Sequence, residues 1–158
     1  MPKLREALED AGFGDVRTYV QSGNVVLASR AAPKTVARKC EQAIEERFGL
    51  DIAVIVRSRD ELAEVIRRNP LKRVAKNPKR YQVCFLAAKP GRDVAAKLEA
   101  AAAPKERVVV DGHEVYAWHP EGIGRSRLWG LLAGKDLGVA ATARNWTTVT
   151  KLLELASD

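Results

Sequence analysis

The residues best suited to chemistry form a short polar loop, Gln21-Ser22-Gly23-Asn24, between two runs that have the pattern of strands. Their side chains offer hydrogen-bond donors and acceptors without charge. Gly23 can take a positive φ without steric cost, and Asn tolerates it better than most residues. The loop therefore predicts either a small polar ligand site or a hairpin turn whose side chains bond their own backbone. The turn explains Gln21 poorly, because Gln is not a preferred turn former.

A second polar group, Arg144-Asn145-Trp146, stands at the start of the last expected helix. Asn145 suits an N-cap, and Trp146 would then pack beneath the first turn. Because a helix N-terminus attracts anions and Arg144 adds a positive charge, the same residues also fit an anion site. The loop at 21–24 and this helix start are the two parts of one candidate ligand site.

Glycines before a short helix form a third candidate, Gly122-Ile123-Gly124-Arg125-Ser126. Such glycines can cradle a phosphate, which adds Arg125 and Ser126 to the candidate ligand-binding residues. No Walker Lys-Ser/Thr pair follows them, and the preceding elements do not form a Rossmann unit. A flexible connector explains the same residues.

Basic residues are concentrated in one segment. The chain has a net charge of +7, and residues 65–92 contain nine Lys or Arg and no Asp or Glu. Outside this window, 18 basic residues face 20 acidic ones. One segment, rather than the whole surface, can therefore meet a polyanion. The alternative is a solvated connector. The predicted nucleic-acid-binding residues are Arg67, Arg68, Lys72, Arg73, Lys76, Lys79 and Arg80.

Signals of enzymatic or metal chemistry are scarce. Cys40 and Cys84 fall at core positions and are expected to be reduced thiols that pack as small hydrophobic side chains. No C-x-x-C motif or Cys/His cluster occurs, so we expect no metal and no cofactor. His113 and His119 have no Cys nearby in sequence, and no Ser in a nucleophile-elbow context. Without an activated nucleophile, a non-enzymatic protein is favoured.

Periodicity predicts helices and strands in alternation. We expect helices at residues 3–11, 34–48, 59–68, 93–102, 126–132 and 145–156. We expect strands at residues 16–20, 25–29, 51–57, 81–87, 108–110 and 114–118. The strand at 51–57 is apolar on both faces and is expected to be central. Ser58 and Glu61 form a capping box, and Asp111-Gly112 is expected to be a hairpin turn.

The order of these elements is αββαβα and then βαββαα. One more strand before the first helix would make both halves begin βαββα, as a split βαβ unit does. The predicted fold class is α+β with two ferredoxin-like halves in tandem, the first strand of the first half being missing. The expected domains are residues 1–69 and 80–158, the latter with the C-terminal helices, joined by a basic connector at 70–79.

Two sequence blocks resemble the bacterial domain of unknown function 1697 family. They span residues 15–26 and 141–152, and residues 124–128 are similar to a weaker third block. In this order they cover essentially the whole chain. The resemblance implies an α+β fold with ferredoxin-like halves and no established activity. Family members usually open with a strand carrying an Arg-Gly-Ile-Asn-Val-Gly-like segment, which has no counterpart here.

These observations lead to three functional hypotheses. The leading one is a non-enzymatic protein that engages an anionic partner, with nucleic acid as a candidate, through the basic connector. The alternative is a small-molecule or phosphate site built from the 21–24 loop and residues 144–146. The third is assembly into a homo-oligomer, because a chain without a central strand exposes a sheet edge. No apolar run approaches 18 residues and no signal peptide is evident, so we expect no membrane span and a cytoplasmic location.

Overall fold

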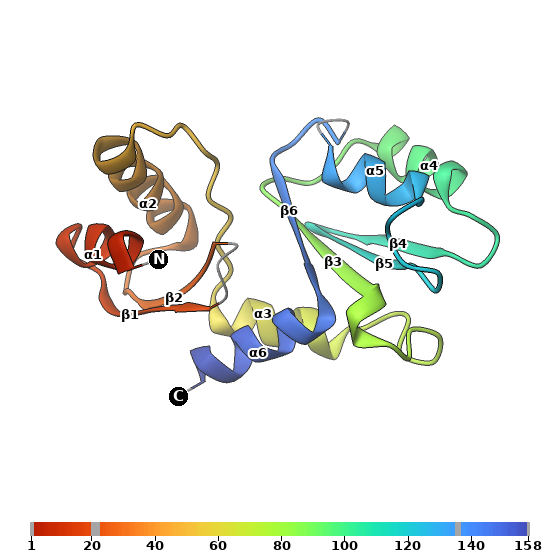
Figure 1. Cartoon of the computed structure of the whole chain (residues 1–158), viewed down its shortest axis with the longest axis horizontal. Coiled ribbons are helices and arrows are strands. Elements are labelled where there is room, and N and C mark those ends of the chain that lie inside the picture. The colour runs from red at the N-terminus through yellow and green to blue at the C-terminus, as the bar shows by residue number, and fades with distance from the viewer. Residues whose placement is uncertain (1, 20–22, 135–136, 158) are drawn as a thin grey trace. The chain divides into compact units, whose positions relative to one another are not determined.

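The computed structural model describes residues 2–19, 23–134 and 137–157, and its helices and strands form two compact units (Figure 1). Unit 1 consists of Met1–Leu62 and Lys151–Asp158, and unit 2 consists of Ala63–Thr150. Helices α3 (Arg59–Arg67) and α6 (Trp146–Ala156) each contribute residues to both units. The predicted α+β class is confirmed, and the whole connector at 70–79 lies within unit 2.

Unit 1 places two helices over one antiparallel hairpin. Its elements are α1 (Pro2–Asp10), β1 (Gly14–Tyr19), β2 (Asn24–Ala28) and α2 (Pro33–Phe48). β1 pairs with β2, and Arg17 lies opposite Val26. Apolar side chains from both helices and from the hairpin meet in one core, formed by Leu8, Phe13, Val16, Val36 and Cys40. Apart from Phe13, which lies between α1 and β1, these are positions that the helical and strand periodicities assign to buried faces.

The ends of two helices follow the sequence closely. Gly49 closes α2 with a left-handed φ of 67°, and its N–H donates to the carbonyl of Glu45. The predicted capping box before α3 is confirmed. The Ser58 N–H donates to Glu61 Oε1 at 2.8 Å, and the Glu61 N–H donates to Ser58 Oγ at 3.1 Å. Local sequence is sufficient here because the bonds join residues three or four positions apart.

The predicted central strand at 51–57 is wrong, since residues 50–58 form neither helix nor strand. Val54 and Val56 still pack against the core of unit 1, and the Val54 N–H donates to Glu41 Oε2 at 2.8 Å. A strand requires a neighbour that completes its hydrogen bonds. Among the described residues of unit 1, β1 and β2 pair only with each other. An apolar, β-branched sequence is therefore not sufficient to make this segment a strand.

Unit 2 is built around one antiparallel sheet of four strands. Its elements follow the order β3 (Tyr81–Leu86), α4 (Arg92–Ala101), β4 (Arg107–Asp111), β5 (Glu114–Trp118), α5 (Arg127–Ala133) and β6 (Ala141–Asn145). The strands lie in the order β4-β5-β3-β6, so β3 pairs with both β5 and β6. All six residues of β3 are buried. A core of Cys84, Leu86, Val115, Ala117 and side chains of α4 and α5 covers one face of the sheet.

Strand β6 was not predicted from the sequence. Its residues, Ala-Thr-Ala-Arg-Asn, lack the apolar run that marks a strand. β6 forms because β3 offers an edge, and Cys84 lies opposite Ala143.

The hairpin of β4 and β5 was predicted, but its turn differs by one position. Asp111 pairs with Glu114, so Gly112 (φ 60°) and His113 form the turn instead of Asp111-Gly112.

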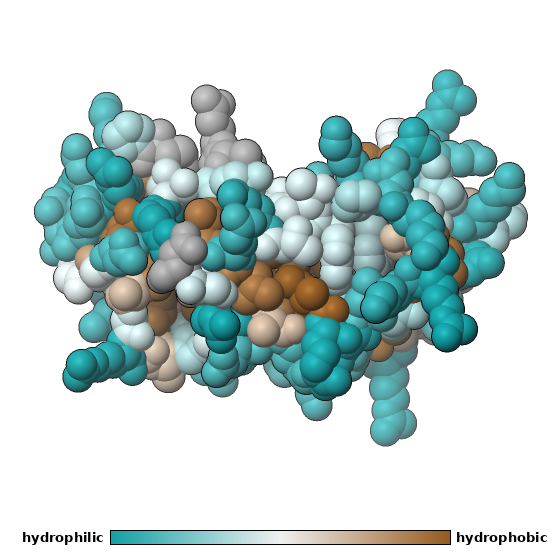
Figure 2. Space-filling model, turned by 90° about the horizontal axis from the view of Figure 1, so that it is seen from below, coloured by the Kyte–Doolittle hydropathy of each residue, from teal (hydrophilic) through white to brown (hydrophobic). Residues whose placement is uncertain are grey.

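The surface is rich in polar side chains. Figure 2 shows hydrophilic side chains over much of one face, with hydrophobic ones gathered between them. Among the helices of the described residues, none combines the length and the apolar character that crossing a lipid bilayer requires.

Candidate functional site

The basic connector of unit 2 is a set of turns with internal supports, and we call residues 69–80 the basic turn. Leu71 is buried, and its carbonyl accepts hydrogen bonds from the N–H groups of Val74 and Ala75 at 3.0 and 2.8 Å. Asn69 Oδ1 accepts from the Tyr81 hydroxyl at 2.6 Å and from the Leu71 N–H at 3.2 Å. These contacts fix the backbone between α3 and β3.

The end of the basic turn is also held. Asn77 Oδ1 accepts from the Lys79 N–H at 3.0 Å and caps the short 3₁₀ turn η1 (Pro78–Arg80). The Arg80 carbonyl accepts from the His119 N–H at 3.0 Å, and the Arg80 guanidinium donates to the Pro120 carbonyl. The basic turn is thus tied to the loop that follows β5.

The seven basic residues predicted to bind nucleic acid fall into two groups. Arg67 is ion-paired with Glu64, Arg68 is ion-paired with acidic residues of the sheet, and Arg80 bonds a carbonyl. The other four are exposed, and the described residues provide no hydrogen-bond or ion-pair partner for their side chains: Lys72, Arg73, Lys76 and Lys79. The part of the predicted surface available to an anion is therefore these four cations.

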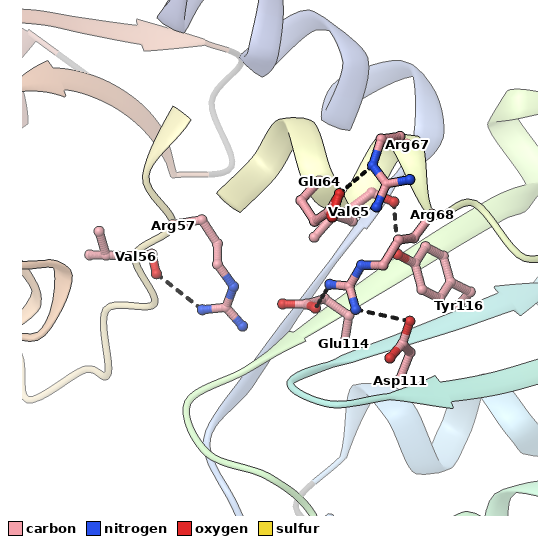
Figure 3. A network of polar contacts seen from close by, with 9 residues as sticks. All are labelled: Val56, Arg57, Glu64, Val65, Arg67, Arg68, Asp111, Glu114 and Tyr116. Atoms are coloured by element: carbon pink, nitrogen blue, oxygen red, sulfur yellow. Dashed lines mark hydrogen bonds and ion pairs between the residues drawn. The ribbon is translucent and has the colours of Figure 1, made fainter. Parts of the chain in front are cut away.

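Arg68 serves the sheet of unit 2 (Figure 3). Its guanidinium bonds Asp111 Oδ2 at 3.1 Å and lies 3.5 Å from Glu114 Oε1. Glu114 is buried, so its carboxylate needs a positive partner there. Beside this pair, the Tyr116 hydroxyl donates to the Val65 carbonyl at 2.7 Å. Burial raises the pKa of Tyr116 to about 12. Arg68 is better explained as a structural residue than as an anion receptor.

The most concentrated polar cluster was missed in the sequence: Glu106, His119 and Ser126. Glu106 Oε2 lies 2.6 Å from His119 Nδ1 and accepts from the Ser126 hydroxyl at 2.6 Å. Glu106 Oε1 accepts from the Ala103 N–H at 2.9 Å. The register of the predicted hairpin could have indicated this cluster from the sequence. Arg107 pairs with Trp118, so one further step brings Glu106 opposite His119.

The surroundings of Glu106 favour its ionised form. Burial disfavours the Glu106 carboxylate, but hydrogen bonds from Ala103, Ser126 and His119 outweigh it, and the pKa of Glu106 is lowered. His119 is 0% exposed, and its ring meets that of Trp129 edge to face at 6.0 Å. Its Nε2 has no hydrogen-bond partner among the described residues.

The geometry of the cluster differs from that of a nucleophilic serine. An activated Ser hydroxyl donates to a His nitrogen. The Ser126 hydroxyl instead donates to Glu106 Oε2 at 2.6 Å, although His119 Nδ1 lies 3.3 Å from the same Oγ. The same oxygen accepts from the Trp129 N–H at 3.0 Å as the N-cap of α5. The cluster therefore joins the hairpin to α5. Ser126 has this role instead of an open phosphate nest, and Arg125 is exposed.

The two parts of the candidate ligand site belong to different units. Gln21 and Ser22 lie outside the described residues. Gly23 has the expected positive φ, 86°, and Asn24 is buried with its Nδ2 donating to the Tyr19 carbonyl at 3.2 Å. Asn24 thus supports its own hairpin in unit 1, as the turn hypothesis expects.

The second part, residues 144–146, is engaged within unit 2. Arg144 donates to Thr142 Oγ1 at 2.5 Å and to the Ala143 carbonyl at 2.8 Å, and burial lowers its pKa. Asn145 Oδ1 accepts from the Thr148 N–H at 2.9 Å, so the predicted N-cap is confirmed. Trp146 stacks on Tyr81, with ring centroids 5.0 Å apart. Each residue has a structural role.

The described residues were also compared with the ligand sets of metal sites. In residues 2–19, 23–134 and 137–157, no group of three or more His, Cys, Asp and Glu side chains could hold a metal ion.

Comparisons with known proteins agree with the fold. A family model described as "Protein of unknown function (DUF1697)" matches residues 1–116. A solved structure, the conserved bacterial protein SP0830 from Streptococcus pneumoniae, is similar with a TM-score of 0.80 and 18% sequence identity. The match covers 100% of this chain and 89% of that one. No curated protein matches the chain. At this identity the similarity extends to the fold alone.

Proposed function

The chain belongs to the DUF1697 family of proteins of unknown function, and we propose that it binds nucleic acid through the phosphate backbone, using the basic turn. The observation that carries the proposal is the four exposed cations Lys72, Arg73, Lys76 and Lys79, within eight residues. No acidic residue interrupts them in sequence. This leaves their positive potential uncancelled within the turn.

Two properties of the turn favour an anionic polymer. Buried Leu71 and the Asn69 and Asn77 side chains hold the backbone, so less conformational freedom is lost when the cations engage phosphates. Tyr81, the aromatic residue that directly follows the basic turn in sequence, is buried and bonded to Asn69. It offers no surface for base stacking, so the binding is expected to be independent of sequence.

The test is the salt dependence of binding to a labelled DNA duplex, measured by fluorescence anisotropy. Four phosphate contacts give a slope of log K against log salt of about −3.6, or a roughly 100-fold loss of affinity between 50 and 200 mM salt. The variant K72A/R73A/K76A/K79A should lose most of this slope. The control R30A/K34A/R38A/K39A removes the same charge from exposed positions of unit 1 and should retain it. Equal losses in both variants, or salt-independent binding, would refute the proposal.

The small-molecule site stays a prediction with less support. The side chains of three candidate residues already make hydrogen bonds within their own elements. Asn24 bonds within its hairpin, Arg144 within its strand, and Asn145 caps its helix. Among the described residues, neither the 21–24 loop nor residues 144–146 presents several unbonded polar groups that converge on one point. Nucleic acid is therefore preferred as the partner class, and the cytoplasm stays the expected location.

The finer fold prediction also belongs with the proposals: two ferredoxin-like halves in tandem, with residues 70–79 as the connector between them. The order α1, β1, β2, α2 in unit 1 repeats α4, β4, β5, α5 in unit 2, and both pairs of strands are antiparallel hairpins. Unit 2 as a whole has the order of a split βαβ unit. In this correspondence, residues 51–57 occupy the position of β6.

A further inference from the structure

The chain between β5 and α5 carries two further cations, and we call residues 119–127 the second basic segment. Arg125 and Arg127 are exposed, and the described residues provide no hydrogen-bond or ion-pair partner for their side chains. Between them, Ser126 is fixed by its bonds to Glu106 and to the Trp129 N–H. The two guanidinium groups therefore extend from a held backbone and are available to a partner.

Backbone turns hold the rest of the second basic segment. The Gly122 N–H donates to the His119 carbonyl at 2.9 Å, and the Ser126 N–H donates to the Ile123 carbonyl at 3.2 Å. Gly122 has a φ of 87°, which a glycine adopts without strain. Because the loop is already ordered, less conformational freedom is lost when its cations engage an anion.

Two contacts tie this segment to the basic turn. The His119 N–H donates to the Arg80 carbonyl at 3.0 Å, and the Arg80 guanidinium donates to the Pro120 carbonyl, 40 positions along the chain. The sheet register explains why they meet, since Tyr81 at the start of β3 lies opposite Trp118 at the end of β5 (Figure 1). The basic turn and the second basic segment thus adjoin at one end of the sheet of unit 2.

Positive charge prevails at this end of the sheet. The acidic residues of the two segments and of the start of β4, residues 103–107, are Glu106 and Glu121. Glu106 is buried and bonded to its neighbours, and Glu121 is exposed. Against these two stand six exposed cations without partners, the four of the basic turn together with Arg125 and Arg127. Their summed potential attracts a polyanion to both segments at once.

We infer that the nucleic-acid surface consists of both segments, with Arg125 and Arg127 binding phosphates beside those held by the basic turn. This inference rests on the proposed function and adds a second contact region to it. Arg suits the role because its planar guanidinium donates two parallel hydrogen bonds to a phosphate. Contacts to phosphates position a nucleic acid without reading its sequence, so the partner class is unchanged while the contact region becomes larger.

The test is the affinity for the labelled DNA duplex between 50 and 200 mM salt, measured by fluorescence anisotropy. Two additional phosphate contacts steepen the slope of log K against log salt by about 1.8, which adds a roughly tenfold loss of affinity over this range. The variant R125A/R127A should therefore have a slope about 1.8 shallower than that of the wild type. The variant K72A/R73A/K76A/K79A should retain this part of the slope.

Two control variants separate the charge at this position from other effects. R125K/R127K keeps both positive charges and should retain the wild-type slope, because counterion release depends on the number of charges. K89A/R92A also removes two exposed cations of unit 2, but these follow Leu86 at the opposite end of β3. This variant should likewise retain the wild-type slope.

Glu121→Gln changes the charge of the second basic segment in the opposite direction. It removes a negative charge from an exposed position beside the proposed phosphate contacts. We expect it to raise the affinity about twofold at 50 mM salt, and less at 200 mM because salt screens the effect.

The outcomes distinguish this inference from the proposed function. An unchanged slope in R125A/R127A, with the expected loss in K72A/R73A/K76A/K79A, overturns the inference and leaves the proposed function standing. The inference also fails if K89A/R92A or R125K/R127K loses as much slope as R125A/R127A, or if Glu121→Gln binds no more tightly than the wild type. Salt-independent binding, or no binding, by the wild type overturns both.

Discussion

Replacement of Glu106 by Gln tests whether the cluster of Glu106, His119 and Ser126 stabilises unit 2. The carboxylate accepts hydrogen bonds from the Ala103 N–H, the Ser126 hydroxyl and His119. A Gln side chain has one acceptor oxygen in place of two, so at least one of these donors loses its partner. A buried donor left unsatisfied costs about 1–3 kcal/mol. We therefore expect Glu106→Gln to lower the free energy of unfolding by about 2 kcal/mol at neutral pH.

The lowered pKa of Glu106 also predicts how the stability difference between wild type and Glu106→Gln changes with pH. The pKa of Glu106 is lower in the folded state than the ordinary carboxyl value of 4.5, so folding favours the ionised form. Its contribution is fully present above the unfolded pKa and is lost as pH falls through the folded pKa. The difference between wild type and Glu106→Gln should accordingly be constant near pH 7 and shrink below about pH 4.5.

The assay is urea unfolding at a series of pH values, followed by tryptophan fluorescence. Trp129 reports on the cluster directly because its ring contacts that of His119. Glu99→Gln is the control, since it makes the same chemical change at an exposed position of α4. If Glu106→Gln is as stable as the control at pH 7, or if the deficit persists undiminished to strongly acidic pH, the carboxylate does not act as described.

Two further predictions concern other supports of the fold. Asn145→Ala should lower the free energy of unfolding by about 1 kcal/mol and Asn145→Ser by much less, because Ser retains an oxygen for the Thr148 N–H; thermal unfolding of both variants compares them. Equal losses would show that the cap is not the cause. Burial raises the pKa of Cys40 to about 11, with a smaller effect of Glu41, and the pKa of Cys84 to about 12. Both thiols should resist a disulfide reagent at pH 8 in the native protein and react in urea, whereas rapid native reaction would contradict their burial.

Much of the local structure follows from the sequence alone. The capping box at Ser58 and Glu61, the end of α2 at Gly49 and the Asn145 cap depend on residues within four positions of each other. Short-range geometry determines such features whatever the rest of the chain does. The resemblance also placed the chain in its family, which the match over residues 1–116 confirms; that match includes the block at residues 15–26.

Long-range pairing decided the rest. Ala141–Asn145 became a strand without the composition of one, and residues 51–57 had the composition and did not, because β3 offers an edge to the first and no described strand offers one to the second. Strand pairing also brings Glu106 and His119 together, because the hairpin register places them opposite each other. Charge content located the basic segment from sequence, and the Arg67–Glu64 pair is local. Tertiary contacts engaged Arg68 and Arg80, because their partners, Asp111, Glu114 and the Pro120 carbonyl, lie far along the chain.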